Sequence, residues 1–196
     1  RSSDLPKRAT NEQIKEFITE KANWINNKQA LIRARLNDVK KEQNMYLYLG
    51  DLFPIKIAQT KDREIIFNGK EFITTSQNKD ALNLSLKSWY KKKFKEVAIP
   101  RLFYFANKHN LKINQVRVKE QKTLWGSCSS KNNINLNYLL IMAPLKVIDY
   151  VIIHELVHTI HKNHSANFWK SVESIMPNYD DARYWLKENG YKLRNL

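Results

Sequence analysis

The segment from Val147 to Ile160 constrains the fold more than any other part of the chain. Its apolar residues recur on nearly every side of a helix: Val147, Ile148, Val151, Ile152, Ile153, Leu156, Val157 and Ile160. A helix that is apolar all round is buried, so we expect this one to lie in the core. It also carries His154, Glu155 and His158, whose burial costs free energy unless a partner compensates them. This favours a metal ion as that partner over a hydrogen-bonded pair of core histidines.

The spacing of the histidines is suited to one ion. Residues four apart lie on one helix face, so the imidazoles of His154 and His158 can reach the same metal. Glu155 projects about 100° from His154, where it can reach a water molecule held by the metal and act as general base. His161 lies about 10 Å from His154 along the helix axis, which is too far to share the ion. Zinc suits such a site, because it binds imidazole and makes water acidic near neutral pH.

A catalytic zinc site with one open position needs a third protein ligand. His164 would lie about 15 Å from His154 on a continuous helix, so it is available only if the chain turns back. Asn163 tolerates the left-handed conformation that ends a helix, and Ser165 is a good N-cap for the next one. We therefore predict that His164 is the third ligand, with Glu173 on the following helix as the alternative.

The rest of the sequence mixes helical and β-strand patterns. Apolar periodicity predicts helices over residues 11–36, 79–110, 144–162, 165–176 and 180–189. Pro100 is expected to kink or divide the second of these helices. β-prone runs predict strands over residues 45–49, 55–59, 65–67 and 72–75, and around Val116 and Ile134. The pair Asn68-Gly69 indicates a two-residue hairpin turn.

This order of elements predicts an α+β fold with a small antiparallel sheet and a buried metal-binding helix. We expect two domains. Residues 1–78 would hold the first helix and the β-rich segment, and residues 79–196 would hold the histidines.

The charge suggests a second kind of partner. The net charge of +15 attracts anions, and nucleic acid is the commonest large one. The basic residues are scattered, apart from Lys91-Lys92-Lys93 and Lys95, whereas a binding module usually concentrates them beside aromatic residues. The alternative function is therefore a basic nucleic-acid-associated protein with a structural or inactive zinc site. A structural site is normally closed by four ligands, often cysteines, and this chain has one cysteine.

Cysteine usage and hydropathy indicate the compartment. Cys128 is the single cysteine, so no internal disulfide forms, which predicts a reducing compartment and most simply the cytoplasm. The apolar run from Tyr150 to Ile153 is far too short to span a bilayer, so no membrane partner is expected.

Several motifs between residues 116 and 190 resemble those of one known family. They are Trp125-Gly126-Ser127-Cys128-Ser129, Ile134-Asn135-Leu136-Asn137, Pro144, Asp149-Tyr150-Val151, His154-Glu155-Leu156-Val157-His158, Asn163-His164-Ser165, Phe168-Trp169 and Met176-Pro177. The family is the YgjP-like metallopeptidases, which are predicted zinc-dependent hydrolases distantly similar to SprT-like and other zincin domains. The resemblance implies a zincin-like catalytic domain, the metal ligands His154, His158 and His164, the base Glu155, and a peptide or protein substrate.

The resemblance also bears on substrate binding and on the start of the chain. In zincins an extended peptide lies along an edge strand, which a hairpin over residues 122–140 would provide. Trp125 and either Asn135 or Asn137 would then face the cleft, or else Trp125 packs in the core and the asparagines face solvent.

Family members usually open with β-strands ahead of the first helix. Such strands are not recognisable here, which suggests that the chain is truncated at its start.

Overall fold

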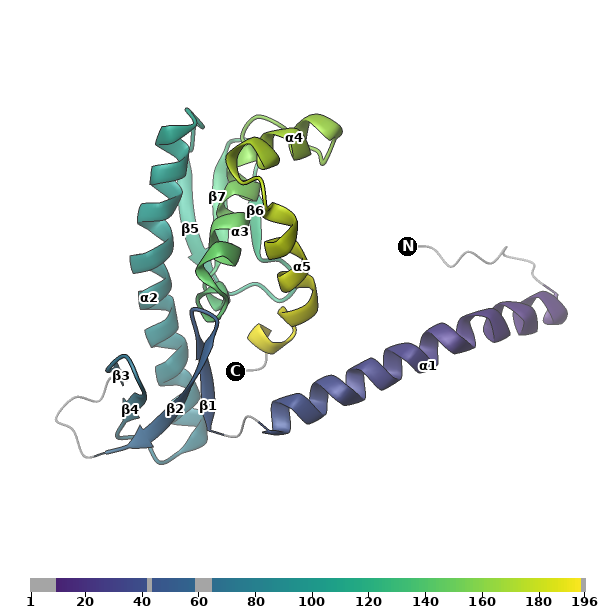
Figure 1. Ribbon diagram of the computed structural model, residues 1–196, viewed down its shortest axis with the longest axis horizontal. Helices are drawn as coiled ribbons and strands as arrows, with labels where there is room; N and C mark the ends of the chain where they lie inside the picture. Colours follow the sequence, from purple (N-terminus) through teal and green to yellow (C-terminus); the bar gives the residue numbers. More distant parts are fainter. Residues whose placement is uncertain (1–9, 42–43, 59–64, 195–196) are drawn as a thin grey trace. The chain divides into compact units, whose positions relative to one another are not determined.

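The computed structural model of the chain describes residues 10–41, 44–58 and 65–194. Two compact units are present, the first ending at Gln43 and the second beginning at Asn44. The elements of each unit are labelled in Figure 1. The domain boundary between residues 78 and 79 stays a prediction.

The first unit contributes helix α1 (Asn11–Lys41), which confirms the helix predicted from residue 11 and extends it. The backbone N–H of Thr10 donates to Gln13 Oε1 at 3.0 Å, and the N–H of Gln13 donates to Thr10 Oγ1 at 3.3 Å. This reciprocal cap satisfies two N–H groups that the start of a helix leaves without partners. It explains why the helix begins at this point.

The second unit opens with a four-stranded sheet in the order β1-β2-β4-β3. Its strands are β1 (Met45–Tyr48), β2 (Asp51–Ile57), β3 (Ile66–Phe67) and β4 (Phe72–Thr74). β2 and β4 pair in parallel, and the other two pairs are antiparallel.

The hairpin predicted at Asn68-Gly69 joins β3 to β4, but its loop has four residues rather than two. Phe67 pairs with Phe72, which leaves residues 68–71 in the loop. The Asn68 side chain accepts hydrogen bonds from the backbone N–H groups of Lys70 and Glu71, both at 2.9 Å. Asparagine side chains often stabilise turns in this way, and here the bonds favour the longer loop.

The turn between β1 and β2 contacts the segment that leads into the central helix. Leu49 and Gly50 both have positive φ, at 51° and 98°, as a tight two-residue hairpin requires. Their N–H groups donate to the carbonyls of Ile141 at 2.8 Å and Met142 at 3.2 Å. A Cβ at Gly50 would lie 2.8 Å from Pro144 Cγ, so only glycine allows this approach. The β-rich segment therefore packs directly against the start of the histidine-bearing helix.

Helix α2 (Lys79–Lys108) runs along one side of this unit. The Asn78 side chain caps it by accepting from the N–H groups of Asp80 and Ala81. α2 continues through Pro100, so of the two outcomes predicted for this residue, a kink or a division, division is excluded. Loss of one N–H bond is outweighed here because buried side chains hold α2 on both sides of the proline: Phe94, Ala98, Leu102 and Ala106.

The second sheet has three strands in the order β5-β7-β6. They are β5 (Gln115–Lys119), β6 (Gly126–Cys128) and β7 (Asn133–Asn137). β6 and β7 form an antiparallel hairpin, whereas β5 and β7 are parallel. The prediction of a purely antiparallel sheet was therefore wrong, because the chain after β5 passes to the far side of β7 before it returns. β6 is left as an edge strand.

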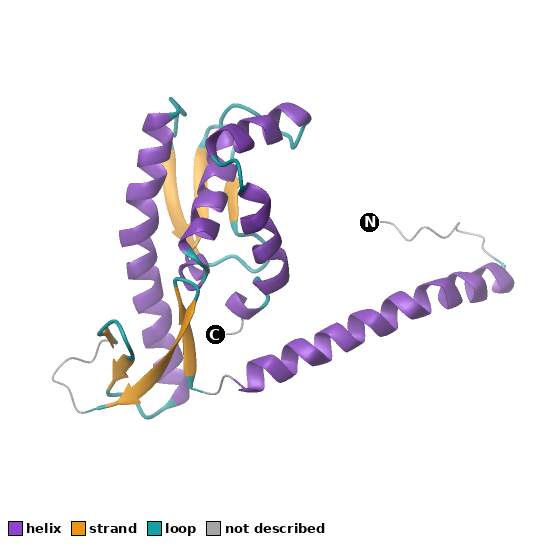
Figure 2. Cartoon of the chain, in the orientation of Figure 1, coloured by secondary structure: helices purple, strands orange, loops and turns teal. Residues whose placement is uncertain are grey.

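The remaining helices are the predicted buried helix, α3, and the helices that neighbour it in sequence. They are the 3-10 helix η1 (Tyr138–Met142), α3 (Leu145–Val157), α4 (Ala166–Ile175), α5 (Tyr179–Asn189) and the 3-10 helix η2 (Lys192–Arg194). α3 contacts α2, α5 and β6, and it lies between α2 and α5 in Figure 1. Its apolar residues named above are buried, except Ile160, which follows the helix and is 56% exposed. Helices and separate sheets confirm the α+β class (Figure 2).

A two-pronged ion pair ties α3 to α2. Arg101 Nε donates to Asp149 Oδ1 at 2.5 Å, and Arg101 Nη2 donates to Asp149 Oδ2 at 2.6 Å. This fork geometry fixes orientation as well as distance. It holds the middle of α3 in register with α2, one turn before the first histidine.

Within the described ranges, no helix is long and apolar enough to cross a membrane.

Candidate metal centre

Three imidazole nitrogens converge at the end of α3. His164 Nε2 lies 3.0 Å from His154 Nε2 and 3.2 Å from His158 Nε2. The three side chains can each offer one ligand atom within 4.8 Å of the others. Glu173, the alternative third ligand, is exposed on α4 and is not part of this group.

These spacings fit a metal ion of the size of zinc. Zinc binds imidazole nitrogen at about 2.0–2.1 Å, and tetrahedral angles then separate two ligand nitrogens by about 3.3 Å. The two measured separations are close to that value. Hydrogen bonds among the three rings are a poorer explanation. A neutral imidazole nitrogen either donates or accepts, so His164 Nε2 cannot satisfy both neighbouring Nε2 atoms at once.

Local structure explains how His164 reaches the other two. α3 ends at Val157 rather than near Lys162 as predicted, and His158 is its C-cap. Thr159 contributes to the ending, since its Oγ1 donates to the Leu156 carbonyl at 2.7 Å and its N–H donates to the same oxygen. The chain then turns through residues 158–163, so the turn begins before the expected place at Lys162-Asn163. α4 begins after Ser165, which occupies the N-cap position without a side-chain cap bond.

A second contact orients one of the rings. His158 Nδ1 lies 2.9 Å from the backbone carbonyl oxygen of His161. A carbonyl only accepts, so Nδ1 carries the hydrogen and Nε2 keeps its lone pair for the cluster. The His161 ring itself points elsewhere, with Nε2 3.1 Å from Ser171 Oγ on α4. The turn thus supplies both His164 and the group that sets the His158 tautomer.

Burial keeps the first two imidazoles in the neutral form that binds metal. Burial, together with smaller contributions from His158, His164 and Arg183, lowers the pKa of His154 to about 3. Burial also lowers the pKa of His158. His154 Nδ1 is buried without a hydrogen-bond partner among the described residues. These imidazoles are therefore uncharged at neutral pH, as metal ligation requires.

Glu155 lies in a tight space between α3 and the edge strand β6. It is 5% exposed, and its Oε2 has no hydrogen-bond partner in the described part of the chain. Burial raises its pKa to about 8. A Cβ added at Gly126 would lie 2.6 Å from both Cγ and Oε1 of Glu155. The glycine backbone thus forms one wall of the space that holds this carboxyl group.

The sequence as a whole matches a known family. The family model of the YgjP-like metallopeptidase domain matches residues 3–189. The chain belongs to the YgjP-like family. Membership makes it a metal-dependent peptidase in general terms, and the predicted resemblance is confirmed.

Two solved structures are similar to this YgjP-like chain. One is the metallopeptidase zymogen of Pyrococcus abyssi abylysin, with 23% identity and a TM-score of 0.41, over 46% of this chain and 93% of that one. The other is the metallopeptidase zymogen of Methanocaldococcus jannaschii jannalysin, with 20% identity and a TM-score of 0.39, over 49% of this chain and 95% of that one. The comparison with curated proteins gives no match.

The structure gives the contacts of the three side chains that were considered for a substrate cleft. Asn137 is fully buried, and its Nδ2 donates to the carbonyls of Gln121 at 2.8 Å and Leu124 at 3.0 Å. Asn137 therefore faces neither a cleft nor solvent, the two alternatives that were predicted for the asparagines. Trp125 lies under the Arg194 guanidinium, whose Cζ is 4.1 Å from a ring centroid. Asn135 donates to Ser127 Oγ across the hairpin at 3.0 Å.

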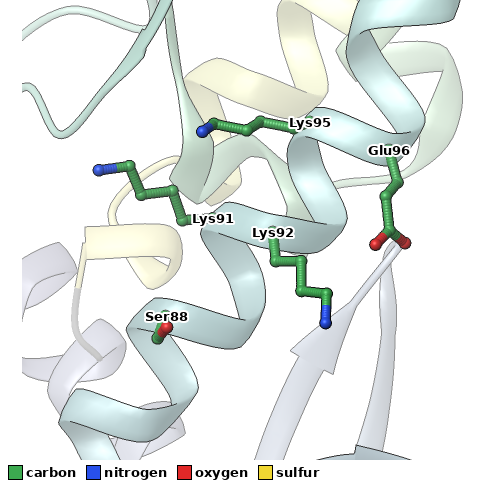
Figure 3. A pocket seen from close by; sticks show the side chains of 5 residues that line it. All are labelled: Ser88, Lys91, Lys92, Lys95 and Glu96. Carbon is green, nitrogen blue, oxygen red and sulfur yellow. The ribbon is translucent and has the colours of Figure 1, made fainter.

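The lysine cluster lies on α2, where side chains of both charges line a shallow hollow of about 520 Å³. Lys91 and Lys95 point to one side of the helix, and Lys92 and Glu96 point to another (Figure 3). Glu96 also accepts from Lys93 at 2.7 Å. The charges are therefore divided and partly neutralised rather than gathered into one basic face. Nucleic-acid binding stays a prediction.

Sequence reasoning did not identify the aromatic layer around the histidines. The Trp169 ring on α4 is stacked on the rings of His164 and Tyr179, with distances between ring centroids of 5.7 Å and 5.4 Å. Tyr179 is in turn stacked on Tyr150 at 6.3 Å, and Tyr150 meets His154 edge-on at 5.8 Å. The layer joins α3, α4 and α5. Its sequence signals are the Phe168-Trp169 and Asp149-Tyr150-Val151 motifs, but the packing of α5 on α3 cannot be read from the residues.

Proposed function

We propose that the chain is a zinc-dependent hydrolase that cleaves peptide bonds, with His154, His158 and His164 as ligands and Glu155 as general base. The convergence of three Nε2 atoms at the end of α3 carries this proposal. Three imidazoles favour zinc over magnesium or calcium, which prefer oxygen ligands. Three protein ligands also leave the open position that catalytic zinc sites keep.

The residues around the site support hydrolysis. Zinc, when bound, supplies Lewis acidity that polarises a carbonyl group and makes a water molecule acidic. Glu155 would take the proton of the attacking water and deliver it to the leaving amine nitrogen. Burial raises the pKa of this carboxyl to about 8, and a nearby cation would lower it toward the operating pH. Glu155 would then be basic enough to take the proton and acidic enough to return it.

An extended peptide is the substrate that the neighbouring strand suits. β6 is an edge strand of its sheet and contacts α3 beside Glu155. A peptide that pairs backbone to backbone with such an edge is held independently of its sequence.

The single cysteine, half-buried Cys128, supports the cytoplasm as the compartment.

Metal analysis with a peptide-library assay tests the proposal. The purified chain should contain about one zinc ion and cleave peptides. A chelator should abolish cleavage, and added zinc should restore it. Metal-free protein that cleaves peptides at the same rate would refute the metal-dependent mechanism. Protein that holds zinc and cleaves no member of the library would instead favour an inactive or structural site.

Gly126→Ala should separate the position of Glu155 from metal binding. The new Cβ would lie 2.6 Å from Glu155 Oε1, so the carboxyl group or β6 must shift. We expect kcat to fall about 10²-fold, a loss typical of small misplacements, with zinc content unchanged. Overpacking should lower the free energy of unfolding by about 1–3 kcal/mol.

Gly69→Ala is the matched control for this variant. Gly69 has a φ of 92° and nothing within 4 Å of an added Cβ, so alanine strains the backbone without touching Glu155. It should cost about 1–2 kcal/mol of stability and leave kcat unchanged. Equal kcat values for the two variants would show that Gly126 does not position the base.

A further inference from the structure

One exposed cation lies beside the candidate metal centre. Arg183 on α5 has its Cζ 4.7 Å from a ring centroid of Trp169. The same Trp169 ring is stacked on His164 and lies 5.9 Å from the His154 ring. One aromatic side chain therefore separates the guanidinium from two of the three candidate ligands.

The aromatic layer links Arg183 to the first ligand by a second route. Trp169 is stacked on Tyr179, and Tyr179 is stacked on Tyr150. The Tyr150 ring in turn meets the His154 ring edge-on. The guanidinium therefore lies on the outer side of the rings that pack against the metal centre.

Arg183 keeps most of its capacity to bind an anion. Its side chain is 55% exposed, and the carboxylate paired with it, Asp180, is 3.5 Å away and 73% exposed. Exposed pairs of this kind contribute little, so a better placed carboxylate could replace Asp180. A guanidinium held over a ring keeps its N–H donors at its edge, where they can grip a carboxylate with two bonds. Trp169 would hold the group in place for that purpose.

We propose that Arg183 binds a carboxylate group of the peptide substrate next to the scissile bond. The proposal rests on the proposed peptidase function and adds a substrate class to it, namely peptides with an anionic group near the cleavage site. The carboxylate belongs either to an acidic side chain or to the C-terminus. The net charge of +15 would draw such peptides toward the protein, and Arg183 would fix their register.

Matched peptide pairs test the preference. Each pair carries glutamate or glutamine at one position near the scissile bond, and each peptide has a free or an amidated C-terminus. The wild type should have a kcat/KM about 10-fold or more higher for the acidic member of at least one pair, since one charge-assisted contact gives about that factor. Arg183→Gln should bring this ratio close to one. Whether the glutamate or the free C-terminus carries the effect identifies the source of the carboxylate.

Arg117→Gln is the control for charge. Arg117 is exposed on β5, at the opposite edge of the sheet from β6, and the substitution removes the same charge. It should keep the wild-type ratio. The ratio should also fall as NaCl rises from about 50 mM to about 500 mM, which a purely structural role for Arg183 would not produce. An Arg183→Gln protein that keeps the full ratio, or an Arg117→Gln protein that loses it equally, would overturn the proposal.

Binding measurements separate this inference from the proposed function. The same peptides are titrated by fluorescence anisotropy into Glu155→Gln protein and into the Glu155→Gln, Arg183→Gln double variant. The acidic peptide should bind the double variant about 10-fold more weakly, whether or not the wild type cleaves it. Equal affinities would refute the role of Arg183 even if the protein is a peptidase. A difference in binding without any cleavage by the wild type would refute the peptidase proposal alone.

Discussion

Replacing Glu155 with glutamine should leave zinc bound and reduce kcat for peptide cleavage by about 10²–10⁴-fold, the usual contribution of a general base. Glutamine has nearly the same shape, so it fits the space beside Gly126, but its amide cannot take a proton from water. The three imidazole nitrogens are on other residues and keep their positions. Metal content by mass spectrometry and initial rates on a cleaved peptide are the two measurements.

Stability supplies the internal control for this variant. Glu155 is 5% exposed with one oxygen lacking a partner, so its charged form is costly to bury. The neutral amide removes that cost, and the melting temperature should stay level or rise. A protein that melts normally, holds zinc and has lost turnover fits the assignment. Full activity in a normally folded variant would end the role of Glu155 as the base.

The sequence predicted a buried helix and the convergence of three histidines at its end, because these patterns are local. Apolar residues on every side of α3 required burial, and a buried His-Glu-x-x-His stretch required a partner. His164 does return to the other two histidines, but not for the predicted local reasons. α3 ends at Val157, Asn163 does not have a positive φ, and Ser165 makes no side-chain cap bond. Helix periodicity therefore carried this part of the prediction, whereas the capping signals did not.

The features that were predicted wrongly or not predicted at all depend on distant packing. The parallel pairing of β5 with β7 is decided by where the intervening chain crosses, and nothing in either strand specifies this. Pro100 remains within α2 because tertiary contacts on both sides outweigh a local preference. The wall that Gly126 forms against Glu155, and the position of Arg183 over Trp169, join segments far apart in sequence. Residue spacing carries no information about such contacts.

Replacing His164 with alanine should weaken zinc binding by about 100-fold or more, because even loss of a partner behind a ligand costs 10–100-fold. The change removes one of three converging nitrogens, and water is a poorer ligand than imidazole for the vacated position. Competition with a chromophoric chelator measures the affinity, and peptide cleavage at a fixed zinc concentration should fall with it.

His161→Ala is the matched control, because it removes a histidine from the same turn without removing a ligand. The His161 ring contacts Ser171, and only its backbone oxygen meets His158 Nδ1, so alanine keeps that bond. Zinc affinity should stay within about three-fold of the wild type, since the substitution removes neither a ligand nor the hydrogen bond to His158. Glu173→Gln completes the set. If His164→Ala retained zinc at full affinity while Glu173→Gln lost it, the third ligand would be the carboxylate on α4, and that helix would have to approach α3 more closely than it does here.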